Sequence, residues 1–157
     1  MSSAPKFKTK VQPGVLIALL NQSLADAIDL KLQAKQAHWN VKGENFIALH
    51  ELFDKAATEI DDYADMLAER AVQLGGMAHG TLQEVARHSK LAAYPAAIQE
   101  GGQHVKALSA AVGMLVDSLR QAIDLSAEEG DAVTADLFTE ITRGLDKWRW
   151  FIESHRK

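Results

Sequence analysis

Apolar residues recur three and four positions apart in four long stretches of the chain, and this spacing places them on one face of an α-helix. The pattern predicts helices over residues 13–40, over 45–74, from 95 onward and from shortly after 126. The predicted core-facing residues are, in chain order, Leu16, Leu20, Leu24, Ile28, Phe46, Leu49, Phe53, Ala56, Ile60, Ala64, Leu67, Ala71, Val105, Leu108, Val112, Leu115, Leu119, Ile123, Val133, Leu137, Ile141, Leu145, Trp148 and Ile152. No stretch shows the alternation of apolar and polar residues that is typical of a strand. The hydrophobic pattern therefore predicts an all-α four-helix bundle.

Proline, glycine and capping motifs mark where these helices are expected to begin and end. Pro13 suits a first helical position, because an N–H there has no intrahelical acceptor. Gly75 and Gly76 are expected to end the second helix. Pro95 is expected to begin the third helix, and the capping box Ser126-x-x-Glu129 is expected to precede the fourth.

The connection between the second and third helices is long, and it contains a helix signal of its own. The capping box Thr81-x-x-Glu84 predicts a short helix near 82–89. A connection of this length suggests a crossover along the bundle, and ferritin-like bundles have one such crossover. We therefore expect a ferritin-like four-helix bundle with a short helix between its second and third long helices.

Composition fits a single globular domain of ordinary polarity. Of the 157 residues, 47% are apolar and 24% charged, and we expect a flexible N-terminal tail over 1–12 followed by the bundle over 13–157. No apolar run approaches the roughly eighteen residues of a membrane span, and the N-terminus lacks the apolar segment of a secretory signal. There is no cysteine, which excludes disulfides and thiolate metal sites and is compatible with a cytoplasmic protein. The net charge of −4 means that DNA binding would need local basic segments.

Five side chains that can bind metals occur in the second quarter of the chain, namely His38, His50, Asp54, Asp65 and Glu69. His50 and Asp54 are four residues apart, as are Asp65 and Glu69, so each pair shares a helix face. The two pairs lie about 16 Å apart along one helix axis, too far to share an ion. An antiparallel copy of the helix, related by a two-fold axis, would bring one pair opposite the other. The spacing therefore favours a metal site shared between two subunits.

The types of the five residues limit which metal ions could bind, but they do not identify a single metal. Imidazoles with carboxylates suit Fe(II), Zn(II) or Mn(II). Each residue alone is more often a surface acid or a hydrogen-bonded core histidine, and only the complete set argues for a site. The chain contains no Glu-x-x-His motif, which argues against a di-iron site within one ferritin-like bundle.

The same stretch resembles the signature of the Dps family, the mini-ferritins that protect bacterial DNA. The matching residues are His38-Trp39-Asn40, Gly43, Phe46, His50, Phe53-Asp54, Asp65 and Ala68-Glu69-Arg70. The resemblance covers most of the chain, including Trp150 to Glu153, and is weakest over the first dozen residues and between about 88 and 135. It implies a dodecamer whose ferroxidase centre takes His38, His50 and Asp54 from one subunit and Asp65 and Glu69 from its two-fold mate. Fe(II) would be oxidised there, by hydrogen peroxide in preference to dioxygen, and stored as Fe(III) mineral.

The resemblance also suggests roles for residues around the centre. Trp39 would donate electrons near the irons, although packing in the core or an interface is the favoured explanation. Asp117, Asp131 and Asp136 would line negatively charged pores at three-fold axes, with a solvated acidic face as the alternative. Lys35 and Arg70 are expected to pair with carboxylates.

Two other functions remain open from the sequence. Lys6, Lys8 and Lys10 form a short cationic segment that could bind DNA, as lysine-rich tails do in some Dps proteins. The protein would then be a nucleoid-compacting structural protein with iron oxidation secondary. A plain helical oligomer with carboxylate-rich interfaces is the third interpretation, and it predicts no Fe(II) binding. In all three interpretations, the pairs Glu84–His88 and Glu100–His104 are expected to form surface hydrogen bonds.

Overall fold

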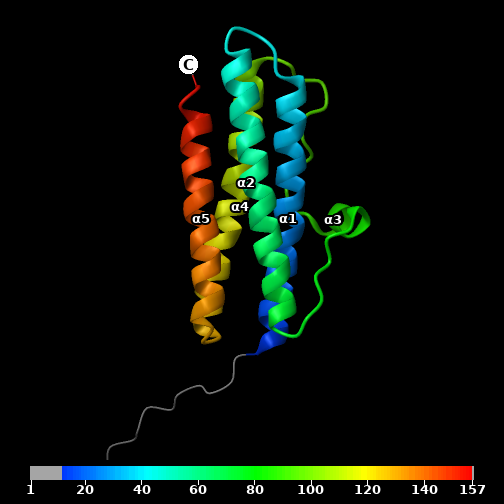
Figure 1. Ribbon diagram of the computed structural model, residues 1–157, viewed down its shortest axis with the longest axis vertical. Helices are drawn as coiled ribbons and strands as arrows, with labels where there is room; N and C mark the ends of the chain where they lie inside the picture. Colours follow the sequence, from blue (N-terminus) through cyan, green and yellow to red (C-terminus); the bar gives the residue numbers. More distant parts are fainter. Residues whose placement is uncertain (1–11, 157) are drawn as a thin grey trace, which may run out of the picture.

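The computed structural model describes residues 12–156, and all the regular structure in that range is helical (Figure 1). Four long helices and one short helix follow in the order α1 (Pro13–Asn40), α2 (Phe46–Gln73), α3 (Leu82–His88), α4 (Gly101–Glu128) and α5 (Ala132–Glu153). This confirms the expected all-α bundle and its short third helix. Lys6, Lys8 and Lys10 lie outside the described residues.

The long helices form one bundle in which α2 and α4 run in one direction and α1 and α5 in the other (Figure 1). The helix pairs α1–α2 and α4–α5 pack most extensively, and α1–α4 and α2–α5 contacts close the bundle. The connection from α2 to α4 passes along the outside of α1 and carries α3, so the long crossover is confirmed (Figure 1). Within residues 12–156, none of the helices combines the length and apolar character of a membrane span.

Large apolar side chains fill the space between the four helices. Phe53 and Phe138 are fully buried, as are most of the residues predicted to face the core. Phe46 and Val133 were predicted wrongly, because they are 42% and 62% exposed. Both lie in the first turn of their helices, beyond the end of the packed interior.

Helix α4 is the third of the four long helices predicted from the sequence. It starts six residues later than predicted, at Gly101 and not at Pro95. The chain before it is held extended across the end of the bundle, where the Lys42 amide donates to the Gln99 carbonyl oxygen at 2.8 Å. Glu100 is the N-cap residue, with an extended backbone. This contact between two connecting segments overrides the helix-start signal of Pro95.

Helix α5, the last of the four predicted long helices, is capped by Asp131. The capping box predicted at Ser126 does not form. Ser126 is buried in the last turns of α4, where its hydroxyl donates to the Ala122 carbonyl oxygen at 2.7 Å. Gly130 then reverses the chain with a φ of +82°. The Asp131 carboxylate accepts hydrogen bonds from the backbone amides of Val133 and Thr134.

Four polar side chains on one face of α1 hold the crossover in place, and we call them the α1 ladder. The four residues are spaced four, three and four positions apart, so they lie in line along the helix, and they are Gln22, Asp26, Asp29 and Gln33. The contacts are Gln22 Nε2 to the His88 carbonyl (2.9 Å), Lys90 N–H to Asp26 (2.7 Å), Ser89 Oγ to Asp29 (2.6 Å) and Gln33 Nε2 to the Ala92 carbonyl (3.1 Å). The ladder supplies hydrogen-bond partners to the last residue of α3 and to the irregular chain that follows it.

Candidate metal centre

His38 at the end of α1 and His50 at the start of α2 form a reciprocal pair. His38 Nδ1 lies 2.7 Å from the His50 carbonyl oxygen, and His50 Nδ1 lies 2.8 Å from the His38 carbonyl oxygen. The rings stack with centroids 3.8 Å apart. A carbonyl oxygen only accepts hydrogen bonds, so each Nδ1 carries a proton, and in a neutral ring the Nε2 lone pair is left for another partner. The role of both imidazoles as metal ligands stays a prediction.

Asp54 lies one turn after His50 on α2, close to His38. Its Oδ1 is 3.9 Å from His38 Nε2 and 2.6 Å from the ammonium nitrogen of Lys35. The hydrogen bond from Lys35, aided by the nearby charges, holds the pKa of Asp54 below its usual value of 3.8. Asp54 is thus an ionised carboxylate whose negative charge is balanced by a lysine, as expected for Lys35.

Asp65 and Glu69 lie further along α2 with exposed side chains. They are about 16 Å and more from Asp54 along the axis, since each residue adds about 1.5 Å. Two shallow grooves of about 370 and 360 Å³ lie beside them and share Ala68 and Ala78 as lining residues. The carboxylates therefore border small-residue hollows on the outer face of the α1–α2 pair.

One chain alone does not assemble the predicted site. Among residues 12–156, no three histidine, aspartate or glutamate side chains are grouped closely enough to hold a metal ion. The chain instead presents two separate halves, His38, His50 and Asp54 at one end of α2 and Asp65 and Glu69 beyond its middle. The metal site shared between two chains therefore stays a prediction.

Trp39 lies beside the histidine pair and is not a core residue. Its side chain is 64% exposed, and the Lys35 ammonium lies 5.6 Å from its ring centroid. Core packing is therefore excluded for Trp39, whereas packing against a second chain and an electron-donating role both stay predictions.

The three predicted pore residues differ in their surroundings. Asp117 and Asp136 are exposed on α4 and α5. Asp131 is only 8% exposed, and besides capping α5 it lies 3.1 Å from the Arg70 guanidinium. Asp131 thus has a structural role that its acidic character did not reveal, while Arg70 pairs with a carboxylate as expected.

Two hydrogen-bonded groups in the interior have no sequence signal. His104, expected at the surface with Glu100, is 1% exposed, and its Nδ1 lies 2.6 Å from the Tyr94 hydroxyl. Burial lowers the pKa of His104 and raises that of Tyr94. The second group joins Glu59, Tyr63 and Trp148 across α2 and α5. By contrast, the Glu84–His88 pair lies at the surface as predicted, at 3.3 Å.

Comparison with known proteins agrees with this architecture. A family model described as a ferritin-like domain matches residues 17–157. A DNA protection during starvation protein from Agrobacterium fabrum is 51% identical over 140 residues, which cover 89% of this chain and 86% of that protein. Among solved structures, Dps from Microbacterium arborescens in the high iron form superposes with a TM-score of 0.86 and 35% identity, covering 94% of this chain and 96% of that one.

A second solved structure gives the same result. Dps from Mycobacterium smegmatis has a TM-score of 0.89 and 28% identity, covering 98% of this chain and 94% of that one. Fold, helix order and sequence similarity thus agree over nearly the whole chain. The chain belongs to the ferritin-like proteins and, among them, to the Dps family, whose members are named for DNA protection during starvation.

Proposed function

We propose that this protein is a ferroxidase that binds Fe(II) between two subunits, oxidises it, and stores Fe(III) as mineral inside a hollow dodecamer. The observation that carries the proposal is the reciprocal His38–His50 pair, because it directs both Nδ1 atoms to backbone carbonyls and leaves the Nε2 atoms for a metal, with Asp54 3.9 Å from His38 Nε2. The relative in its high iron form supports iron as the metal.

The second half of the site comes from a second copy of the chain. In a two-fold pair with α2 helices antiparallel, Asp65 and Glu69 of the partner would lie opposite the histidines. The grooves at Ala68 and Ala78 give such a partner a surface on which to pack closely. Three carboxylates and two imidazoles then provide a set of ligands that suits Fe(II).

Charge explains how the site would take up iron and favour its oxidation. The Lys35 ammonium occupies the Asp54 carboxylate at 2.6 Å and must move aside when a cation binds there. The carboxylates favour Fe(III) over Fe(II), because the higher charge is more strongly stabilised by anions. With hydrogen peroxide as oxidant, each of two Fe(II) ions gives up one electron and the peroxide becomes water, so that no hydroxyl radical is released.

A subunit-mixing experiment tests both the ligands and the sharing. One variant carries Asp65→Asn and Glu69→Gln, and the other carries His38→Gln and His50→Gln. Each alone should lose peroxide-driven Fe(II) oxidation, because every site lacks two of its five proposed ligands. Assemblies formed from equal amounts of both should recover about a quarter of the wild-type rate, since half of random dimers are mixed and each mixed dimer has one intact site of two.

A variant with Asp124→Asn and Glu128→Gln is the matched control, because it removes the same charges four residues apart on the exposed face of α4. It should oxidise Fe(II) at the wild-type rate. Full activity in either ligand variant would refute the ligand assignment. Inactive parents with no recovery in confirmed mixed assemblies would refute the sharing.

DNA binding is a second proposed function, supported by the names of the relatives as DNA protection proteins. In the cytoplasm of a bacterium, such a protein would associate with the nucleoid and shield DNA as well as remove iron and peroxide. The cationic residues proposed for this contact are Lys6, Lys8 and Lys10, which the structure does not describe.

A further inference from the structure

The Glu59 carboxylate joins two oxidisable aromatic side chains between α2 and α5. It accepts hydrogen bonds from the Tyr63 hydroxyl and from the Trp148 indole N–H. The Lys147 ammonium adds a third donor, 3.1 Å from Glu59 Oε2. Burial raises the pKa of Glu59, but these three donors outweigh it and hold the pKa below 4.5, so the carboxylate is ionised and free to accept a proton.

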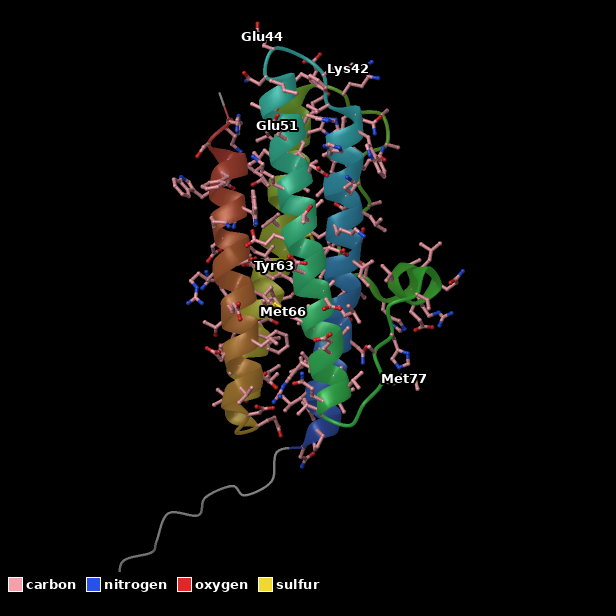
Figure 2. The ribbon with its side chains drawn as sticks, in the orientation of Figure 1. Lys42, Glu44, Glu51, Tyr63, Met66 and Met77 are labelled. Atoms are coloured by element: carbon pink, nitrogen blue, oxygen red, sulfur yellow. The ribbon has the colours of Figure 1, made fainter. Side chains whose placement is uncertain are left out.

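Tyr63 is held in place by α5. Its side chain is 7% exposed, and its hydroxyl rests on the α5 backbone at Gly144, where an added Cβ would lie only 1.7 Å from the oxygen. Figure 2 shows Tyr63 at the middle of α2. Burial and the Glu59 charge raise the pKa of the phenol, so Tyr63 stays protonated until it is oxidised. Glu59 lies one helical turn before Tyr63 on α2 and is its proton acceptor.

Aromatic rings connect this buried group to the surface. The Trp148 ring is 5.7 Å from Phe151, and Phe151 is 4.9 Å from Trp150, measured between ring centroids. Trp148 is 7% exposed, whereas Trp150 is 65% exposed. Oxidisable side chains therefore lead from solvent at Trp150, past one phenylalanine, to Trp148 and then to Tyr63.

We propose that Trp150, Trp148 and Tyr63 form a one-electron path that intercepts oxidants of the hydroxyl-radical class, with Glu59 as the proton acceptor. The oxidant takes one electron from Trp150. An electron from Trp148 then reduces the oxidised Trp150, and an electron from Tyr63 reduces the oxidised Trp148. Tyr63 loses one electron and passes its phenol proton to Glu59. The products are the reduced oxidant, a neutral tyrosyl radical and a protonated Glu59, so charge and protons balance.

The charges around the path fix its direction. The Lys147 ammonium lies 4.7 Å from the Trp148 ring centroid, and a cation over an indole disfavours a positive charge on that ring. Tyr63 avoids this penalty, because its radical is neutral once the proton has moved to Glu59. The oxidising equivalent therefore comes to rest on Tyr63, in the interior. None of these residues belongs to the proposed iron site.

The test uses the full-length, iron-free protein and a photogenerated tris(bipyridine)ruthenium(III) oxidant, with electron paramagnetic resonance as the readout. The wild type should yield a neutral tyrosyl radical, and Tyr63→Phe should lose it. Tyr94→Phe is the matched control, because Tyr94 is the only other tyrosine and also has a buried basic partner in His104. The radical should persist in this variant.

The entry point and the proton acceptor have their own variants. Trp150→Phe should lower the radical yield several-fold, because Trp150 is the solvent-exposed end of the path. Glu59→Gln keeps an acceptor for Trp148 but cannot take the phenol proton, so the neutral Tyr63 radical should be lost. Circular dichroism confirms that each variant is folded. A radical on Tyr94, a radical that survives Tyr63→Phe, or a yield insensitive to Trp150 would overturn the proposal.

Discussion

Asp131 combines two tasks in one nearly buried carboxylate. It caps α5 through the amides of Val133 and Thr134 and the Thr134 hydroxyl, and it pairs with Arg70 across the bundle. Burial raises the pKa of Asp131, but the Thr134 and Arg70 contacts outweigh this effect and lower it below 3.8. The ionised form is therefore the one that stabilises the fold.

Asp131→Ala should lower the free energy of unfolding by about 2 to 4 kcal/mol at neutral pH, since it removes a helix cap and leaves Arg70 without its partner. Because the pKa in the folded protein is depressed, the stabilisation is complete above the ordinary value of 3.8 and is lost as the pH falls through the folded value. Thermal unfolding at one protein concentration, at neutral and at strongly acidic pH, measures the difference between variant and wild type.

Asp136→Ala is the matched control for this prediction, because Asp136 is exposed on the same helix. It should change stability by less than about 0.5 kcal/mol. An Asp131→Ala protein as stable as this control at neutral pH would show that neither the cap nor the ion pair matters.

The histidine pair shows what a residue-level prediction can and cannot reach. The sequence predicts His38 and His50 as ligands by type and spacing. It gives no sign that each Nδ1 is bound by a backbone carbonyl of the other residue, because main-chain acceptors are the same for every amino acid. The orientation of the two rings is therefore visible only in the fold.

At the scale of elements, helices with a continuous apolar stripe were predicted well and their ends less well. The predicted 13–40 and 45–74 agree with α1 and α2 to within a residue. The start of α4 was missed because a contact between distant connections, Lys42 with Gln99, holds the preceding chain extended. Local signals such as Pro95 cannot report a partner that is far away in the sequence.

Gly144 is the position where packing between elements most sharply limits the sequence. Alanine normally favours a helix over glycine by about 1 kcal/mol. At Gly144, however, the new Cβ would collide with the Tyr63 hydroxyl, so Gly144→Ala should destabilise the protein by about 1 to 3 kcal/mol. Thermal unfolding measures the effect.

Gly102→Ala provides the comparison, since nothing lies within 4 Å of a Cβ there. This variant should be as stable as the wild type or slightly more stable. If Gly144→Ala behaved in the same way, Tyr63 would not be seated on α5, and the electron path that ends at Tyr63 would lose its geometric basis.

At the scale of the whole molecule, the chain is half of its proposed active unit. The fold could be predicted because its core lies within one chain, and the family because the ligand spacing is specific. The closed site could not be seen in one chain, because Asp65 and Glu69 lie along α2 from Asp54 and need a partner to meet the histidines.

The proposed DNA contact also belongs to the whole molecule, because an assembly repeats each lysine in every subunit. Substituting Lys6, Lys8 and Lys10 with glutamine should weaken DNA binding at low salt. It should also reduce the slope of log affinity against log salt by about one for each lysine that contacts a phosphate. Gel shifts over a salt series measure this, with Lys31→Gln on α1 as a control. Unchanged binding would place the DNA contact elsewhere.

The α1 ladder has a consequence for how freely the crossover can vary. Three of its four rungs bind backbone groups, those of His88, Lys90 and Ala92, and only Ser89 contributes a side chain. The path of the crossover is thus determined mainly by side chains of α1, and not by the side chains of the crossover itself. Residue 90 must keep its N–H and so cannot be proline, whereas most other side chains at 88, 90 and 92 are compatible with the same route. Because α1 binds mainly the backbone of the crossover, the exposed side chains at residues 88, 90 and 92 can change while the crossover keeps its path.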